Sequence, residues 1–472
     1  MGKRAMVDAL RQPLRIAMHK ACESAARLER AILAVASIVV PRIDMFSVFA
    51  RYSSQMDANI WLGLAGSSML GLGAALECTG EGKDRFATIS ACWHDAVRHA
   101  VIEGDAPPVA FGGFRFDAAR PASSVWPGFG DGALVVPRLT VVQYGRDCCR
   151  VIAAEQMFPG SDAVARAEAA LSLWEGLAGG NAIHPTHRNA HVQVLIPKNA
   201  KNQWCALVHA ALHSISQGDA RKIVVARTLK AKAADPFTLP DILDRLRSAN
   251  PKAAIFAFGR KGTYFVGATP EILITAHSGT FRTMALAGSA ARSETPQQDA
   301  RLGQALLTSP KDRLEHDFVV QAVLQVLQSC CSRIEADSSP SLHKLPTVQH
   351  LVTFFRGDIL PHKSLLDVIA RLHPTPAVGG VPAGSALAFL RDHEGFDRGW
   401  YAGPVGWLDA EGNGEFMVAL RSGVIQGNEA VLFAGCGLVA GSDPEKEYQE
   451  TWIKFSTMLN GLCPAQGAEF VI

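Results

Sequence analysis

Hydrophobic and polar positions near the start of the chain predict two consecutive elements. Residues 1–29 mix charged residues with apolar ones at helical spacing, which indicates an amphipathic helix. Residues 31–40 (AILAVASIVV) are apolar and end at Pro41, so they predict a buried strand or a short helix. A bilayer-spanning helix needs about 20 apolar residues. The sequence has no stretch of that length, so a membrane protein is not expected.

From about residue 203 to residue 462, helical and strand patterns alternate and are separated by sharp turn signals. A β-branched run at residues 222–227 (KIVVAR) predicts a strand. Because successive side chains on a strand point to opposite faces, Lys222, Val224 and Ala226 should share one face. A lysine in such a strand is either a charge at a sheet edge or a base placed in a site.

Two short apolar runs, residues 254–258 and 264–267, flank the sequence Gly-Arg-Lys-Gly at 259–262. This pattern predicts a β-hairpin. Its second strand runs toward Glu271, which follows Pro270. A carboxylate in this place is either an ordinary turn residue or a functional acid.

A helix is predicted to begin after Ser309, because serine is a good N-cap and Pro310 suits the first helical position. Counting back from its apolar stripe by three and four residues reaches Glu315, so a carboxylate should head the buried face. A buried carboxylate without a partner costs several kcal/mol, which makes a functional partner for Glu315 the natural expectation. The stripe comprises Phe318, Val319, Ala322, Val323 and Val326.

The last helix should begin near Asp443, which can cap it, with Pro444 in its first turn. Glu447, Glu450 and Lys454 form one stripe at spacings of three and four residues. The neighbouring stripe is apolar and comprises Tyr448, Trp452, Phe455, Leu459 and Leu462.

The two helices together offer two acidic pairs, Asp312 with Glu315 and Glu447 with Glu450, each three residues apart. Helices that present carboxylates inward suggest a hard divalent cation such as Mg²⁺, which proteins often hold with one or two carboxylates. The alternative is a solvated acidic face in which Glu450 only pairs with Lys454.

Composition narrows the classes of function. The chain has 46 Lys and Arg against 44 Asp and Glu, a net charge of +2, which argues against a nucleic-acid binder with a basic patch. Apolar residues make up 48% and charged residues 19%, so wholesale disorder is excluded. The ten cysteines show no CxxC pair and no zinc spacing. We expect free thiols in a reducing compartment, and hence a cytoplasmic protein.

Several of these segments, in this order, resemble the motifs of chorismate-utilising enzymes. Residues 267–271 (GATPE) look like their GxSPE motif, with Thr269 in place of its serine, and residues 309–317 (SPKDRLEHD) match their KDxxEH helix. The resemblance covers roughly residues 203–462. Further matching segments are residues 285–292 (ALAGSAAR), 349–351 (QHL), 372–380 (LHPTPAVGG), 396–407 (FDRGWYAGPVGW), 416–422, 433–439 (FAGCGLV) and 442–454 (SDPEKEYQETWIK).

The resemblance implies an α+β fold, in which large antiparallel β-sheets pack in layers with helices on the outside, within one large domain. Residues 1–200 would form the variable N-terminal half of this fold, and residues 201–472 its chorismate-binding catalytic region. Residues 111–117 (FGGFRFD) resemble a stretch of the variable half. A polar stretch at residues 181–189 is expected to be a connection.

The resemblance also implies roles for individual residues. Lys222 looks like the base that activates water, and Glu271 like the acid that protonates the leaving hydroxyl. The residues expected to bind substrate are Gly288, Ser289, His350, Ala377, Tyr401, Arg421, Gly435, Gly437 and Lys454.

The resemblance also implies a metal site. Glu315 and Glu450 would hold Mg²⁺, and Asp312 and Glu447 would support it through waters. The cation would bind the ring carboxylate of chorismate and offset its charge beside the acidic residues.

The residue at position 222 separates the branches of this family. Anthranilate synthases carry glutamine there, whereas aminodeoxychorismate synthases carry a nucleophilic lysine in a loop that here reads Leu-Ala-Gly-Ser at residues 286–289. Salicylate synthases typically have threonine at the position of Ser289 and often at that of Ala377. Ser289 and Ala377 therefore favour the isochorismate synthase branch.

The expected reaction is a reversible, Mg²⁺-dependent conversion of chorismate to isochorismate, by water attack at C2 and loss of the C4 hydroxyl. The length and residues 111–117 resemble bacterial isochorismate synthases that feed salicylate-based siderophores, and the product would be handed to an isochorismate pyruvate lyase. One alternative is a salicylate synthase, which also eliminates pyruvate. Another is a non-catalytic chorismate-binding relative, which would need a lost base, acid or metal ligand, and none is lost here.

Overall fold

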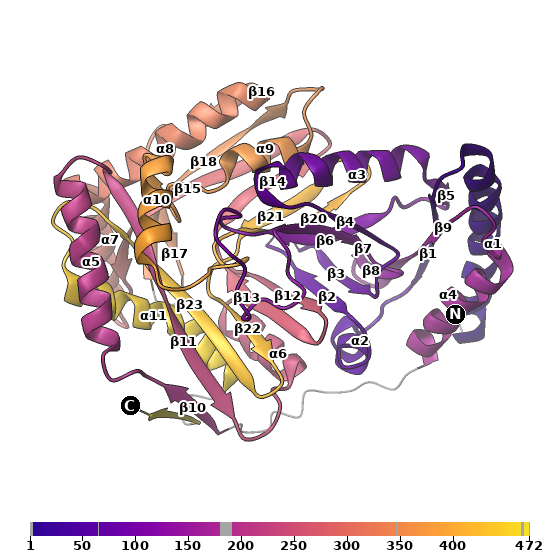
Figure 1. The fold of residues 1–472 in the computed structure, drawn as a ribbon, viewed down its shortest axis with the longest axis horizontal. Helices are drawn as coiled ribbons and strands as arrows, with labels where there is room; N and C mark the ends of the chain where they lie inside the picture. The colour runs from indigo at the N-terminus through magenta and orange to yellow at the C-terminus, as the bar shows by residue number, and fades with distance from the viewer. Residues whose placement is uncertain (1–2, 65, 180–190, 346–347, 464–466, 472) are drawn as a thin grey trace.

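The computed structural model describes residues 3–64, 66–179, 191–345, 348–463 and 467–471. The connection expected at residues 181–189 lies outside these ranges. Within them the chain forms two large β-sheets with helices around the outside (Figure 1). This arrangement confirms the α+β class and the layered sheets that the motifs implied.

The larger sheet has 14 strands, and neighbouring strands in it are antiparallel apart from the pairs β1–β5 and β10–β24. Its strands, in spatial order, are β24 (Ala468–Val471), β10 (Val192–Leu195), β11 (Lys222–Ala233), β23 (Glu429–Leu438), β22 (Ser422–Gln426), β13 (Thr263–Thr269), β12 (Ala254–Arg260), β2 (Ala58–Leu62), β3 (Ser68–Leu72), β8 (Leu139–Tyr144), β9 (Cys148–Met157), β1 (Ile32–Pro41) and β5 (Val101–Glu103), and β19 (Gly380–Val381) pairs with β11.

The second sheet has ten strands and is antiparallel. In spatial order they are β16 (Cys331–Ala336), β18 (Val348–Ile359), β15 (Thr280–Ala291), β14 (Ile272–His277), β21 (Gly414–Val418), β20 (Pro404–Asp409), β6 (Val109–Phe114), β7 (Gly132–Val136) and β4 (Leu76–Thr79), and β17 (Ser341–Lys344) pairs with β18. Both sheets thus take strands from either side of residue 200, and a boundary there stays a prediction.

Eleven α-helices and one short 3₁₀ helix lie in the described part of the chain. They are α1 (Lys3–Leu28), α2 (Met45–Tyr52), η1 (Gly82–Asp84), α3 (Arg85–His99), α4 (Ala163–Gly179), α5 (Ala200–Ser216), α6 (Leu239–Ala249), α7 (Pro296–Thr308), α8 (Pro310–Cys330), α9 (Leu365–Leu372), α10 (Ala383–His393) and α11 (Pro444–Leu462). Figure 1 shows α1 and α4 at one end of the molecule and α5, α7, α8 and α11 at the other. None of the helices within the described ranges is both long and apolar enough to cross a bilayer.

Two hydrophobic cores follow from the two faces of the larger sheet. Along β1, Leu33 and Val35 point into the first core, whereas Ile32 and Ala34 point into the second, as the alternation of a strand requires. The second core is closed by α1, α2, α4, α6 and α11. The first also takes side chains from the ten-stranded sheet, and its largest side chains with under 2% exposure are Trp61, Phe111, Phe114, Phe256, Phe258, Phe265, Phe281, Phe355 and Trp400.

The hairpin expected around residues 259–262 is confirmed, but its turn is shorter than that stretch. β12 and β13 pair as far as Arg260 opposite Thr263, which leaves a two-residue turn of Lys261 and Gly262. Both turn residues have positive φ, +49° and +76°. Such turns match the twist of the paired strands, which is why glycine follows the lysine.

The buried carboxylate of Glu415 links the two sheets. This residue of β21, in the ten-stranded sheet, accepts hydrogen bonds from Trp61 Nε1 at 3.0 Å, from the Leu64 N–H at 3.1 Å and from Ser67 Oγ at 2.8 Å. All three donors belong to the hairpin of β2 and β3 in the other sheet. Three hydrogen bonds satisfy a carboxylate that burial would otherwise penalise.

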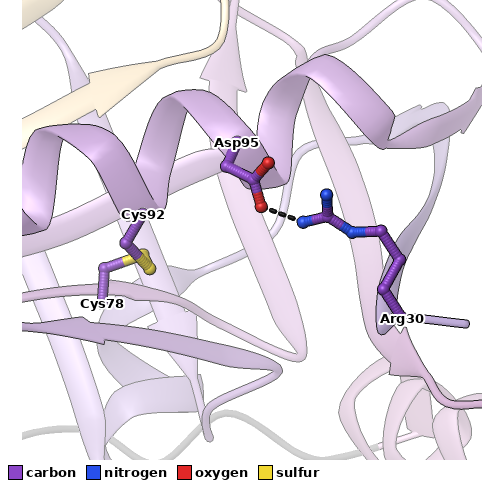
Figure 2. Close-up of a disulfide and its surroundings, with 4 residues drawn as sticks. All are labelled: Arg30, Cys78, Cys92 and Asp95. Carbon is purple, nitrogen blue, oxygen red and sulfur yellow. Dashed lines mark hydrogen bonds and ion pairs between the residues drawn. A yellow bond between two sulfur atoms is a disulfide. The ribbon is translucent and has the colours of Figure 1, made fainter.

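The expectation of ten free cysteines is wrong at one pair. Cys78 on β4 and Cys92 on α3 form a disulfide, although the other eight are free thiols (Figure 2). The two residues are 14 positions apart, and only the fold brings them together. One turn further along α3, Asp95 pairs with Arg30, just before β1. Helix α3 is therefore bonded to strand β4 and to Arg30, which precedes β1.

Candidate active site

Strand β11 carries the first site residue at its beginning. Its alternation turns Lys222, Val224 and Ala226 toward a cavity, whereas Ile223 and Val225 lie in the first hydrophobic core. This confirms the predicted faces. The Lys222 amine lies 2.8 Å from Glu315 Oε1, and only 2% of the lysine side chain is exposed. Lys222 is thus a paired, buried lysine and no edge charge.

Helix α8 supplies that carboxylate from the opposite side. Ser309 caps the helix by accepting the Asp312 N–H, as expected. The predicted stripe headed by Glu315 is wrong by one position. The buried face begins at His316, whose Nε2 lies 2.8 Å from Thr353 Oγ1, and Glu315 sits at its edge, facing the cavity. The rest of that buried face is Val319, Val323, Leu327 and Cys330.

Helix α11 brings the second acidic pair. Lys454 Nζ lies 2.7 Å from Glu450 Oε1 and donates to the Gly435 carbonyl at 2.7 Å. Burial raises the pKa of Glu450, but the charge and hydrogen bond of Lys454, with the charge of Arg421, more than offset it and hold that pKa below its usual value. Burial and the charge of Glu450 raise the pKa of Glu447 to about 7. The pair therefore shares less than two full negative charges near neutral pH.

Glu271 enters from the junction of β13 and β14. Its backbone N–H donates a hydrogen bond to Thr269 Oγ1 at 3.4 Å, and the Thr269 hydroxyl in turn donates to the Val418 carbonyl. Thr269 thus keeps a hydroxyl where the family motif has serine. Glu271 is 6% exposed, and burial raises its pKa to about 7 despite the opposing effect of three nearby cations, Lys222, Lys454 and Arg421.

A bulge in the pairing of β15 and β18 shapes another wall. The register shifts between Ala287 and Ser289, and Gly288 adopts φ of +74°, which glycine tolerates. Ser289 Oγ then lies 2.9 Å from His350 Nδ1. Burial, with the cations Arg421 and Lys454, lowers the pKa of His350 to about 3, so the ring is neutral.

Two buried arginines reach the cavity in different states. Arg398 directs its N–H groups to Glu394, Val378 O and Val224 O. Arg421 has φ of +49°, a strained conformation for a residue with a side chain. Among the described residues, none forms a hydrogen bond or ion pair with its guanidinium. Arg421 is therefore available to an anionic ligand, and Arg398 is committed to the protein.

The absence of side chains at two glycines of β23 leaves room for the Lys222–Glu315 ion pair. Val224 pairs with Gly437 and Ala226 with Gly435. A Cβ at Gly437 would lie 3.0 Å from Lys222 Cε and 3.1 Å from Glu315 Oε1. Any larger residue there would press on both partners.

All fifteen residues singled out from the sequence line this one cavity, whose volume is about 170 Å³. Sequence reasoning assigned no role to Lys311, Arg398, Phe433 and Cys436, which also line it. Each lies in a motif segment, but nothing in a motif shows which side chains face inward. Phe433 stacks on Tyr401 at 5.0 Å between ring centroids.

The residues present suit a hard cation in their donor chemistry. Across the described ranges, no group of three or more His, Cys, Asp or Glu is already gathered as a metal-binding set. Five carboxylates nevertheless line the cavity. Burial and the neighbouring charge of Glu450 raise the pKa of Glu447, so the two glutamates form a like-charge pair that a cation would relieve. Mg²⁺ needs only one or two protein carboxylates, because waters and substrate complete its octahedron.

Comparison with known proteins places the chain in a family. Residues 18–463 match the family model described as chorismate binding enzyme. The chain belongs to this family. It is 38% identical to the salicylate biosynthesis isochorismate synthase of Pseudomonas aeruginosa, over all of this chain and 98% of that protein. It is 33% identical to the isochorismate synthase MenF of Bacillus subtilis, over 94% and 96%.

Solved structures agree with this placement. The menaquinone-specific isochorismate synthase MenF from Escherichia coli superposes with a TM-score of 0.76 at 26% identity, over 94% of this chain and all of that one. Anthranilate synthase component I from Streptococcus pneumoniae, at 20% identity, has a TM-score of 0.68 over 83% and 92% and shares the fold. The family resemblance found in the motifs is therefore confirmed.

The tight space at Gly437 yields a prediction. Gly437→Ala should lower chorismate turnover by about tenfold or more, because its methyl group would displace the Lys222 amine from Glu315. Gly130→Ala is the matched control, since a Cβ there meets open space. Turnover and melting temperature should be measured for both. Equal, unimpaired turnover in the two variants would show that the fit at Gly437 does not matter.

Proposed function

We propose that this chain is an isochorismate synthase, which converts chorismate to isochorismate reversibly. The observation that carries the proposal is the buried Lys222 amine in one cavity with Glu271, a carboxyl group whose pKa is raised to about 7. A base and an acid that face one substrate are what the exchange of one hydroxyl for another requires. The full-length similarity to proteins named isochorismate synthase supports it.

In this proposal Lys222 acts as the free amine, after it has lost the proton that pairs it with Glu315, and it accepts a proton from the water that attacks C2 of chorismate. The ring double bonds shift as the C4 hydroxyl leaves, and Glu271 donates the proton that makes the leaving group water. One hydroxyl is gained and one is lost, so the reaction needs no oxidant or reductant. A pKa of about 7 lets Glu271 be protonated at neutral pH, which an ordinary glutamate is not.

The remaining cavity residues bind and orient the substrate in this proposal. Arg421, which has no ion pair of its own among the described residues, holds the carboxylate of the enolpyruvyl arm, with Tyr401 beside it. Neutral His350, held by Ser289, shapes the wall near the ring. Lys454 balances the acidic pair on α11.

Mg²⁺ is part of the same proposal. Glu315 and Glu450 would hold it, with Asp312 and Glu447 in support, and the cation would neutralise the ring carboxylate of chorismate. The proposal places the product in salicylate or siderophore synthesis, with an isochorismate pyruvate lyase as the next enzyme. A cytoplasmic location also stays a proposal, since eight free cysteines suit a reducing compartment and the Cys78–Cys92 disulfide does not.

The product test decides the function. Purified protein incubated with chorismate and Mg²⁺ should reach a plateau at which chorismate and isochorismate are both present, because exchanging hydroxyls has little net driving force. Chromatography over time follows both compounds. Salicylate and pyruvate formed at the rate of chorismate loss would instead make the chain a salicylate synthase. No turnover at all would favour a chorismate-binding protein without catalysis.

The acid–base pair gives the next prediction. Lys222→Ala and Glu271→Gln should each lower kcat by roughly 10² or more, the usual share of a positioned proton acceptor or donor. Lys230→Ala, an exposed lysine on the same strand, is the control and should leave kcat unchanged. Since Glu271 acts protonated, wild-type activity should fall as the pH rises through about 7. A near-normal rate in Lys222→Ala would require another base.

The metal site can be tested separately. Glu450→Gln should abolish turnover and weaken Mg²⁺ binding measured by calorimetry, because the amide keeps the shape but loses the charge. Glu445→Gln is the matched control on the same helix, where the carboxylate is exposed and pairs with Lys201 at 2.6 Å. Melting temperatures check that both variants fold. Full activity of Glu450→Gln, or of the wild type in excess chelator, would contradict the site.

A further inference from the structure

One edge of strand β11 is covered by two short strands with a gap between them. β19 pairs with Lys222 and Ile223, and β10 pairs with residues 230–233. Residues 224–226 in the gap are buried, so the carbonyl of Val224 and the N–H of Ala226 need partners other than water. An unsatisfied group here would cost as much as a lost hydrogen bond.

A buried ion pair fills the gap. The Ala226 N–H donates to Glu394 Oε1 at 2.7 Å, and Arg398 Nη2 donates to the Val224 carbonyl at 2.7 Å. The glutamate supplies the acceptor and the arginine the donor that a neighbouring strand would have supplied. Two side chains thus stand in for a strand at this edge.

The pair is rigid and dry. Arg398 Nε and Nη2 each donate to one oxygen of Glu394 at 2.7 Å, a bidentate contact, and the side chains are 4% and 3% exposed. The guanidinium also lies over the Phe116 ring, 4.3 Å from its centroid. Its position is therefore fixed from three sides.

The same guanidinium reaches a second wall of the cavity. Arg398 Nη1 donates to the Val378 carbonyl at 2.9 Å, in the turn at residues 375–379. The turn bonds directly to the strand as well, since the Val224 N–H donates to the Gly379 carbonyl at 3.0 Å. Ala377 and Val378 of this turn line the cavity. The Arg398 guanidinium therefore holds the strand that begins at Lys222 in a fixed position relative to the turn that carries Ala377.

We propose that Glu394 and Arg398 are positioning residues for the reaction, which hold the start of β11 so that the Lys222 amine lies at a fixed place relative to the substrate-facing turn. The inference rests on the proposed function, in which Lys222 is the base. We assign Arg398 a positioning role, because its four hydrogen bonds go to Glu394, Val224 and Val378.

The test uses Arg398→Lys, which keeps the charge but cannot form all four hydrogen bonds at once. It should lower kcat roughly 10- to 100-fold and leave the KM for chorismate within about twofold, because a displaced base affects the chemical step more than binding. Hydrogen exchange should become faster in the peptide that contains residues 222–228. Glu394→Gln keeps an acceptor for Ala226, so it should change both quantities in the same direction by less.

A buried carboxylate elsewhere, which pairs with two partly exposed arginines, supplies the control. Glu155 is 7% exposed and pairs with Arg138 at 3.0 Å and Arg166 at 2.8 Å, on β9 far along the sheet from β11. Glu155→Gln should lower the melting temperature, as loss of a buried carboxylate does, without changing kcat or exchange at residues 222–228.

The outcomes separate the two proposals. If the wild type makes isochorismate and Arg398→Lys retains its kcat, the positioning role is overturned. If exchange at residues 222–228 does not change, the ion pair does not hold the strand, whatever the kinetics. If the wild type forms no isochorismate, the proposed function fails and the kinetic half of this inference fails with it. The exchange measurement then still decides whether the pair braces β11.

Discussion

The contact between Lys222 and Glu315 is the constraint on which the cavity depends. A lysine with 2% exposure has to meet an opposite charge, and the nearest carboxylate comes from a helix that packs on the other sheet. The 2.8 Å contact therefore fixes the spacing between β11 and α8. It also favours glycine at 437, since a Cβ there would lie tightly against both partners. The cavity is consequently a space between two layers, with a charge pair at its base.

The same burial determines how the other groups in the cavity behave. Desolvation raises the pKa of Glu271 and of Glu447 to about 7 and lowers that of His350 to about 3. Glu450 stays ionised, because the adjacent Lys454 lowers its pKa by more than burial raises it. One environment thus holds a protonatable acid, a neutral imidazole and an anionic carboxylate side by side. The sign of each shift follows from burial first and from the nearest charge second.

How far the sequence predicted this site depends on the range of the interactions. Local signals were reliable, as at the Ser309 cap and the alternation of β11, because they depend on neighbouring residues. Counting a helical stripe misplaced Glu315 by one position, since the apolar residues on α8 cover more than one face. Two features depend on contacts made only after folding. They are the disulfide between Cys78 and Cys92 and the hydrogen bond from Arg398 to the Val224 carbonyl. Residue spacing along the sequence therefore could not predict either of them.

The N-terminal half contributes no residue to the cavity wall among those described, yet it fixes two of the loops that do. Arg115 pairs with Asp397 at 2.8 Å, next to Arg398, and the Phe116 carbonyl lies 2.9 Å from His373 Nε2, at the start of the other loop. Phe116 also lies against the Arg398 guanidinium. Residues 111–117 are therefore one of the places where the N-terminal half contacts the loops of the C-terminal half. They influence the chemistry through the placement of the two loops, so a substitution in this segment should disturb both loops together even though no reacting group belongs to it.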